Sequence, residues 1–320
     1  MNVYVVGSGG VGRYLGDALA ATGADVTYAP RRIADVVPVA ADLAIVAVKA
    51  YDTDDAIATL RAALAGNGDA TILTPQNGVG NEERLADAFG ADRIVSCALT
   101  VPVELGPSGD VVASNRGGIA LAPVGAVAQN WLVAAFERTA IPVRVASDYR
   151  ALKWSKLALN VMANASCAIL DVLPVHLVEL AGMFELEVRA VREVRAVMAA
   201  LGLAPIDLPR YPVRALFTAV SLPLPVARLV LARRIAGARG RKAPSLLLDV
   251  RAGKGRTEVD VLNGAVAAAG RAAGVPTPVN AALARVLRDI SAMPALANSY
   301  RERPEALIAE VQSEELRGAA

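Results

Sequence analysis

The 320-residue sequence has few of the residues that define several large protein classes. Its two cysteines, Cys97 and Cys167, lie far apart and neither belongs to a CxxC pair. They argue against a disulfide scaffold or a zinc site and suit a reducing compartment. The single histidine, His176, leaves no room for a metal cluster built on histidines, and we expect it to be structural. We therefore predict no metal site.

Strong charge and long apolar runs are also missing. The formal net charge is +2 and no segment interleaves aromatic with basic residues, which argues against nucleic-acid binding. Polar residues or prolines interrupt the apolar stretches at 157–183 and 213–237, so no membrane span is expected. The N-terminal MNVYVVGSGG has no basic region or cleavage site of a signal peptide. With 54% hydrophobic residues, we expect a globular cytoplasmic protein of two domains.

A glycine-rich turn follows the first apolar segment. NVYVVG, residues 2–7, is typical of a buried parallel strand, and RYLGDALAATG has the apolar spacing of a helix. Between them, Gly7 permits a tight turn, Gly9 lets the backbone approach a pyrophosphate, and Gly12 lets the helix pack on the strand. We predict a dinucleotide-binding turn formed by the whole motif: Gly7, Ser8, Gly9, Gly10, Val11 and Gly12.

The second strand, residues 24–29, indicates which dinucleotide binds. Asp25 opens this strand, whereas ligands bind outside the carboxyl ends of parallel strands. That end carries Arg31 and Arg32, with no acid for a ribose 2′-hydroxyl. Arginine there suits a 2′-phosphate, so NADP(H) is favoured over NAD, the alternative being a solvated basic turn.

Strands and helices continue to alternate, which predicts a doubly wound parallel sheet. The segments 42–50 and 70–79 are expected strands, and they place Lys49 and Asn77 just past carboxyl ends, where the nicotinamide half of a cofactor should lie. Shorter β-like runs between 93 and 146, with one helix at about 127–139, should extend the sheet with mixed or antiparallel strands.

Helical spacing dominates from Asp148 onward, and no convincing strand remains. We therefore expect an α/β Rossmann-type domain at 1–147 and an all-α domain at 148–320. The expected helices span 148–170, 176–201, 211–240 with proline breaks, 244–252, 257–273 and 278–291.

The segment KWSKLALNVMAN, residues 153–164, combines an apolar helix with a polar stripe. At ~100° per residue, Lys153, Asn160 and Asn164 fall within roughly 80° of Lys156. Because the rest of this helix is apolar, it should be largely buried. The stripe then faces a partner, a ligand or a wet cleft, or alternatively solvent.

Two further polar positions lie at the starts of expected helices. Ser245 begins the apolar helix of KAPSLLLDV, and Glu258, in GRTEVDVLNG, lies in the first turn of the next helix. Each has a simple alternative explanation, Ser245 as a helix N-cap and Glu258 as an acid favoured by the helix dipole.

Taken together, these segments resemble the ketopantoate reductase (2-dehydropantoate 2-reductase) family over nearly the whole chain. The similar stretches are GSGGVG, VKAY at 48–51, QNGVGNEE at 76–83, KWSKLALNVMAN and SLLLDVRAGKGRTEVDVLNG. The resemblance implies a Rossmann domain followed by a helical domain of the 6-phosphogluconate dehydrogenase C-terminal type, with the active site between them.

The resemblance also implies residue roles. Lys156 matches the catalytic lysine and Glu258 the acid that engages the substrate oxygen. Asn160 and Asn164 match substrate-binding asparagines, and Ser245 matches the serine that contacts the substrate carboxylate. The cofactor-binding positions of the family correspond to Gly7, Gly9, Gly12, Arg31 and Asn77 in this sequence. Lys49 matches a lysine at the junction of cofactor and substrate. Lys153 has no counterpart.

The implied activity is NADPH-dependent reduction of ketopantoate to pantoate. Alternatives are a sister reductase of another small 2-keto acid and a catalytically silent NADP-binding regulator. The sequence departs from the family pattern in a short segment after Arg32, near the expected adenosine site, and in a Ser245-to-Glu258 spacing that is one residue longer. A basic segment at 233–242 is also unusual: Arg239, Arg241 or Lys242 could reach an anionic substrate, the alternative being an irregular helical cover with a solvated basic end. A homodimer formed through the helical domain is compatible with the sequence, which does not decide it.

Overall fold

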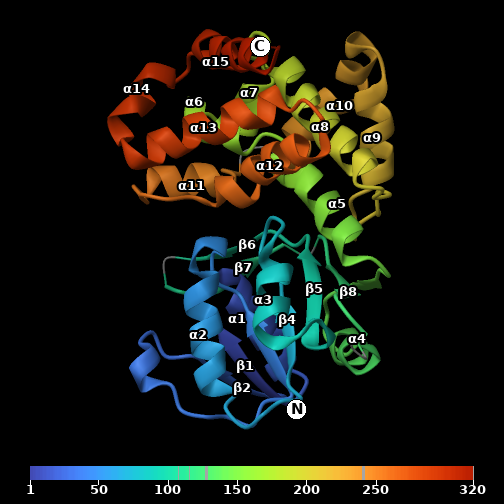
Figure 1. Cartoon of the computed structure of the whole chain (residues 1–320), viewed down its shortest axis with the longest axis vertical. Helices are drawn as coiled ribbons and strands as arrows, with labels where there is room; N and C mark the ends of the chain where they lie inside the picture. The colour runs from blue at the N-terminus through green and yellow to red at the C-terminus, as the bar shows by residue number, and fades with distance from the viewer. Residues whose placement is uncertain (107, 115, 127–128, 240–241, 320) are drawn as a thin grey trace. The chain divides into compact units, whose positions relative to one another are not determined.

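The computed structural model describes residues 1–106, 108–114, 116–126, 129–239 and 242–319, without the side chains of 233–239 and 319. The chain forms two compact units (Figure 1). The first comprises Met1–Lys153 and Ile206–Pro212, and the second Trp154–Pro205 and Val213–Ala320. The division after Lys153 falls inside helix α5, six residues beyond the boundary expected at 147.

The first unit is an α/β unit. Its strands are β1 (Asn2–Val6), β2 (Asp25–Tyr28), β3 (Leu43–Val46), β4 (Thr71–Thr74), β5 (Ile94–Leu99), β6 (Val103–Leu105), β7 (Val111–Ala113), β8 (Ile119–Pro123) and β9 (Val143–Val145). Its helices are α1 (Gly10–Ala20), α2 (Thr53–Ala63), α3 (Asn81–Phe89) and α4 (Asn130–Glu137), with 3-10 turns η1 (Ile33–Asp35), η2 (Ala50–Asp52) and η3 (Ala91–Arg93).

The main sheet has the strand order β2-β1-β3-β4-β5-β8-β9. The five strands β1 to β5 are parallel, β8 runs antiparallel to β5, and β9 is parallel to β8. The chain changes direction across the sheet between β1 and β3. In doubly wound sheets, ligands bind outside the carboxyl ends of the strands at such a point.

Alternate residues of each strand pack into two separate cores. Val3 and Val5 of β1 face one side of the sheet, where Leu15 of α1 and Phe136 of α4 cover them. The intervening Tyr4 faces the other side, which α2 and α3 cover with side chains that include Leu60 and Leu85. A sheet covered on both faces needs strands that are apolar throughout, as the sequence predicted.

The expectation that all the later β-like runs extend the main sheet was wrong for two of them. β6 and β7 pair with each other in a separate two-stranded antiparallel sheet. This hairpin packs against α1. Leu105 and Val112 are exposed, so the hairpin is not covered on both faces as the strands of the main sheet are.

The second unit is helical. Its elements are α5 (Tyr149–Val161), whose first turn belongs to the first unit, α6 (Ala165–Leu170), α7 (Pro174–Leu177), α8 (Met183–Ala200), α9 (Val213–Ser221), α10 (Leu224–Arg239), α11 (Ser245–Arg251), η4 (Glu258–Val261), α12 (Asn263–Ala273), α13 (Pro278–Ala292), η5 (Pro294–Leu296), α14 (Ala297–Tyr300) and α15 (Pro304–Ala319). The central helix is α13, which contacts α6, α8, α12 and α15. Among the described residues beyond 148, no strand occurs, and no helix is both long and apolar enough to cross a membrane.

Three expected helices are broken where a periodic pattern did not reveal a stop. The 148–170 segment divides after Val161, and 176–201 divides before Gly182, whose φ is +75°. The 257–273 segment divides into η4 and α12. The first of these breaks changes the position of a predicted site residue.

Candidate functional site

The turn after β1 has the steric properties that a dinucleotide-binding motif requires. Gly7 has a φ of +108°, and a Cβ there would lie 2.7 Å from the main-chain carbon of Ala47. A Cβ on Gly12 would lie 1.9 Å from the Gly7 oxygen. A Cβ on Gly9, in contrast, would have no heavy atom within 4 Å. The structure therefore demands glycine at the first and third positions and leaves open space at the second, which fits the close approach of a pyrophosphate.

The N-terminus of α1 completes this turn. The helix begins at Gly10, and its first turn holds no acidic residue to repel an anion. Arg13 donates from Nε to the Ser8 oxygen at 3.1 Å and from Nη1 to the Gly109 oxygen at 3.0 Å. The arginine thus ties the turn to the β6–β7 loop. Val11 is half-buried against the core between α1 and the sheet.

The other predicted cofactor residues lie at the carboxyl ends of neighbouring strands. Lys49 follows β3 and occupies the N-cap position of η2 without a side-chain capping bond, and Asn77 follows β4. Both are half-buried. Arg31 follows β2 on an exposed loop. The strand order places these loops, with the glycine turn of β1, along one edge of the sheet.

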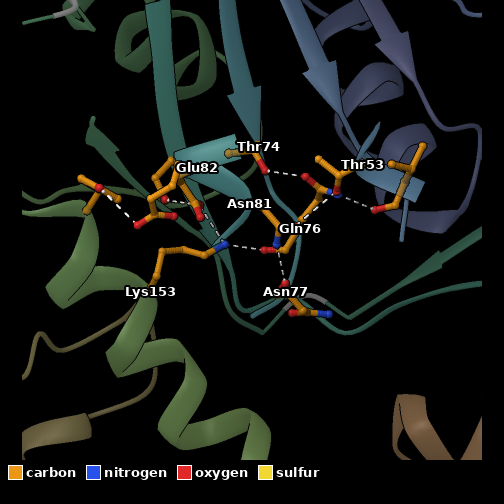
Figure 2. Close-up of polar contacts among 11 residues, drawn as sticks. Thr53, Thr74, Gln76, Asn77, Asn81, Glu82 and Lys153 are labelled. Atoms are coloured by element: carbon orange, nitrogen blue, oxygen red, sulfur yellow. Dashed lines mark hydrogen bonds and ion pairs between the residues drawn. The ribbon is translucent and has the colours of Figure 1, made fainter. Parts of the chain in front are cut away.

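A buried hydrogen-bond network connects two of these loops, and the sequence did not reveal it (Figure 2). The Gln76 side chain donates from Nε2 to the Thr53 hydroxyl at 2.9 Å and accepts from the Thr74 hydroxyl at 3.0 Å. Asn81 donates to the Asn77 carbonyl at 3.0 Å. The signal in the sequence was a glutamine that follows an apolar strand, but its partners Val48 and Thr53 are distant in sequence.

Lys153 is a member of this network. Its Nζ lies 3.0 Å from Glu82 Oε1 and donates to the Gln76 carbonyl, and the two charged side chains are only 2% and 1% exposed. Ser96 donates to the same Glu82 oxygen at 2.8 Å. Of the polar stripe on 153–164, Lys153 therefore faces partners inside the first unit. The alternative that the stripe faces solvent is wrong for this residue.

The remaining stripe residues lie in the second unit. Lys156 is half-buried on α5, and Asn160, one turn later, is 7% exposed. Asn164 is not on α5: it precedes α6, after Ala163 with a φ of +52°. The prediction of one continuous helix through 164 was wrong.

A buried carboxylate explains why the helix breaks there. Glu187 of α8 accepts hydrogen bonds from the main-chain N–H of Ala163 and from the Ser166 hydroxyl. It is fully buried, so these bonds compensate for its desolvation. The break depends on a residue of another helix, which helical periodicity cannot report.

The break brings Asn164 to the start of α11. Its Oδ1 accepts from the Leu246 main-chain N–H at 3.1 Å, which places the asparagine beside Ser245. Ser245 is the first residue of α11 and half-buried, whereas Pro244 occupies the N-cap position and makes no side-chain capping bond. The alternative that Ser245 is an N-cap was wrong. Two of the predicted substrate residues are therefore neighbours.

Glu258 opens the 3-10 turn η4 and is 4% exposed. It precedes α12 by several residues, so it is not an acid in the first turn of that helix. The Thr257 hydroxyl caps η4 by accepting from the Val259 N–H at 3.5 Å. The Glu258 side chain is therefore buried, and its main chain lies at the capped start of η4. The dipole of α12 does not explain an acid at this position.

Another acid in the second unit has a shifted pKa. Glu193 of α8 accepts from the main-chain N–H groups of Val279 and Asn280 at 2.8 and 2.9 Å, and from the Asn280 side chain at 2.7 Å. Burial raises the pKa of Glu193 to about 7, against the opposing effect of these hydrogen bonds and of Arg189. Since Glu193 caps the start of α13, it holds the central helix of the unit.

The structure describes only part of the basic segment at 233–242. Arg241 and the side chain of Arg239 lie outside the described residues, and Lys242 is exposed.

The single histidine and the two cysteines can also be placed. His176 is exposed, with Nδ1 at 3.8 Å from Glu179. Cys97 and Cys167 are buried and form no disulfide.

The strand order, the glycine turn and the all-helical second unit define a Rossmann-type dinucleotide-binding protein with a helical second domain. Residues 33–126 match the family described as "Ketopantoate reductase PanE/ApbA", and residues 148–291 match "Ketopantoate reductase PanE/ApbA C terminal". The chain belongs to the ketopantoate reductase family.

Individual relatives agree with this assignment. The 2-dehydropantoate 2-reductase of Halobacterium salinarum is 32% identical over 256 residues, covering 78% of this chain and 75% of that protein. That of Pyrobaculum aerophilum is 29% identical over 251 residues, covering 76% and 75%. The crystal structure of a ketopantoate reductase of Ralstonia eutropha has a TM-score of 0.74, 28% identity and coverage of 91% and 98%. A D-mandelate dehydrogenase solved with NADH and anilino(oxo)acetate shares the fold, with a TM-score of 0.73, 18% identity and coverage of 91% and 98%.

Proposed function

We propose that this protein reduces 2-dehydropantoate to (R)-pantoate with NADPH, a step of pantothenate and coenzyme A biosynthesis. The observation that carries the proposal is the similarity to a 2-dehydropantoate 2-reductase at 32% identity over 256 residues. The steric demand for glycine at Gly7 and Gly12 supports a bound dinucleotide. The proposal assigns NADPH to the carboxyl edge of the sheet and the keto acid to the polar residues of the helical unit.

Cofactor binding is assigned to the first unit. The N–H groups of the turn from Gly7 to Gly12 bind the pyrophosphate, and Arg31 binds the 2′-phosphate through charge-assisted hydrogen bonds. Lys49 and Asn77, at the ends of β3 and β4, are assigned to the nicotinamide half. When bound, NADPH supplies the hydride that reduces the keto group.

The chemistry at the substrate is assigned to the second unit. As C2 of the keto acid is reduced, negative charge builds on the carbonyl oxygen. The Lys156 ammonium stabilises that charge and transfers its proton to the oxygen, which yields the hydroxyl of the product. Glu258 accepts a hydrogen bond from this hydroxyl and orients it.

Three uncharged side chains complete the proposed substrate site. Asn160 and Asn164 hydrogen-bond the keto acid, and Ser245 contacts its carboxylate. The hydrogen bond from Leu246 to Asn164 supports this assignment, because it places Asn164 beside Ser245. Amides and a hydroxyl bind a carboxylate without adding charge beside the lysine.

A sister reductase of another 2-keto acid is the second candidate. It is favoured by the shared fold of a D-mandelate dehydrogenase that was solved with NADH and a different oxo acid. A silent regulator is disfavoured because both Lys156 and Glu258 are present. Pocket shape decides between 2-keto acids that differ in a side chain.

We also infer a cytoplasmic enzyme that forms a homodimer through the helical unit. The two cysteines without a disulfide support a reducing compartment. A Staphylococcus aureus relative of the same fold, 16% identical, is described as dimeric. Sedimentation equilibrium tests the assembly: a single species of monomer mass across the concentration range would contradict it.

NADPH oxidation against a panel of 2-keto acids tests the proposed function. The panel contains 2-dehydropantoate, pyruvate, 2-oxoisovalerate and phenylglyoxylate, with NADH as the control cofactor. The proposal predicts saturable oxidation of NADPH with 2-dehydropantoate, and a kcat/KM at least about tenfold lower for each other acid and for NADH. A higher kcat/KM with another acid would favour the sister reductase, and no turnover with any acid would favour the silent regulator.

A further inference from the structure

One side chain bridges the two loops that carry Lys49 and Asn77. Gln76 Nε2 donates to the Val48 carbonyl at 3.2 Å and to the Thr53 hydroxyl at 2.9 Å. Gln76 immediately precedes Asn77, and Val48 immediately precedes Lys49. The Gln76 amide therefore links the two loops at the carboxyl ends of β3 and β4, beside the residues that precede Lys49 and follow it.

The bridging amide is itself held in one orientation. The Thr74 hydroxyl donates to Gln76 Oε1 at 3.0 Å, and Thr53 is fixed by donation to the Ala50 carbonyl at 2.8 Å. The Val48 carbonyl accepts only, so a flipped amide would set its oxygen against that carbonyl and lose the bond to it. The side chain of Gln76 is buried, so lost bonds would not be replaced by water.

Lys153 holds the main chain at the same residue. Its Nζ donates to the Gln76 carbonyl and pairs with Glu82 Oε1 at 3.0 Å (Figure 2). The Ser96 hydroxyl donates to the same Glu82 oxygen. Both charged groups are almost completely buried. A buried ion pair contributes little net stability compared with apolar side chains of similar volume, because desolvation offsets the attraction. Its effect is to fix geometry, and here it fixes the peptide that joins Gln76 to Asn77.

We propose that Gln76, Glu82 and Lys153 are positioning residues for the nicotinamide half of NADPH. They act through Asn77 and Lys49 by setting the spacing and orientation of the two loops. This inference rests on the proposed function, which assigns those two residues to the cofactor. It gives Lys153, which the family pattern left without a role, a function distinct from that of Lys156.

The test compares direct NADPH binding with stability. The variants are Lys153→Met, Gln76→Leu, and the double variant Glu82→Gln with Lys153→Met. NADPH dissociation constants are measured by calorimetry, together with thermal midpoints and the KM of the keto acid. A matched control is Arg93→Met, because Arg93 holds the loop at the opposite end of β4 by donating to the Ala70 and Asn67 carbonyls at 3.0 and 3.2 Å.

Each variant should raise the NADPH dissociation constant by about tenfold or more, the value of about one hydrogen bond to a charged group. The KM of the keto acid should change less than about twofold, as should the NADPH dissociation constant of the control. Lys153→Met leaves Glu82 buried without its cation, so this variant should melt well below the wild type. The double variant leaves no charge unpaired and should recover part of the midpoint without recovering NADPH affinity.

The outcomes separate the two proposals. If the double variant and Gln76→Leu bind NADPH as tightly as the wild type does, the positioning role is wrong even though the enzyme assignment stands. If Arg93→Met weakens NADPH binding equally, the effect is general destabilisation and the positioning role is again wrong. If the wild type itself does not bind NADPH, the proposed function fails first.

Discussion

Asn164 and Leu246 are joined by a hydrogen bond of 3.1 Å, from the main-chain N–H of Leu246 to the side-chain oxygen of Asn164. The bond connects the break after α5 to the first turn of α11. A residue predicted to bind substrate therefore also satisfies a backbone donor. Its two roles make different demands on the side chain, and mutation can separate them.

Substitution of Asn164 should distinguish its structural bond from substrate binding. Asn164→Ala leaves the buried Leu246 N–H without its acceptor and should lower the free energy of unfolding by about 1–3 kcal/mol. Asn164→Asp keeps an acceptor oxygen, so it should lose less stability, but its negative charge should raise the KM of an anionic keto acid at least about tenfold. Urea denaturation and initial rates provide the two measurements. An Asn164→Asp enzyme with an unchanged KM would remove Asn164 from the substrate site.

The glycine turn offers a contrast between two positions. Gly12→Ala places a Cβ 1.9 Å from the Gly7 oxygen, so the variant should unfold at a much lower temperature than the wild type. Gly9→Ala meets no heavy atom within 4 Å and should keep its thermal midpoint. It should nevertheless weaken NADPH binding by about tenfold or more, because the methyl group occupies the space of the pyrophosphate. Unchanged NADPH affinity in Gly9→Ala would place the cofactor elsewhere.

Arg31 should set the preference for NADPH. Arg31→Ala removes a cation from the loop after β2 and should raise the NADPH dissociation constant by about tenfold, with less than about a twofold change for NADH. Arg32→Ala, on the same loop, is the matched control and should have a smaller effect. Calorimetry with both nucleotides provides the comparison. An equal loss for NADPH and NADH in Arg31→Ala would show that the arginine does not recognise the 2′-phosphate.

Glu193 should make stability depend on pH. Its folded-state pKa of about 7 lies above the ordinary glutamate value of 4.5, so between these values the folded state binds more protons than the unfolded state. The contribution of Glu193 to stability is therefore fully present below about pH 4.5 and decreases as pH rises to about 7. Urea denaturation of wild type and Glu193→Gln at several pH values measures the difference in unfolding free energy. The unfolding free energy of the wild type should fall relative to that of Glu193→Gln as pH rises. A difference between the two that does not change with pH would contradict the raised pKa.

The sequence predicted those features that depend on local patterns. The strand at 2–7, the glycine turn and the alternating segments through 79 follow from apolar periodicity and from the steric freedom of glycine. These patterns were sufficient to predict a doubly wound parallel sheet and to place Lys49 and Asn77 past the ends of strands. The placement of β8 antiparallel to β5 was also within the expectation of mixed strands.

Features that depend on distant partners could not be predicted in this way. Lys153 binds the carbonyl of a residue 77 positions earlier, and the break before Asn164 depends on Glu187, 24 positions after Ala163. Helical periodicity reports which face a residue occupies but not which group it meets. The separate β6–β7 hairpin and the helices after 292 were not predicted from the sequence either.

The central claim is that the ammonium of Lys156 protonates the reduced carbonyl oxygen. Single-turnover oxidation of enzyme-bound NADPH by 2-dehydropantoate, compared between the wild type and Lys156→Ala, tests it most directly. The account predicts a hydride-transfer rate about 10²–10⁴ times lower in the variant, with NADPH affinity unchanged within about twofold. A variant that transfers hydride at the wild-type rate would contradict it.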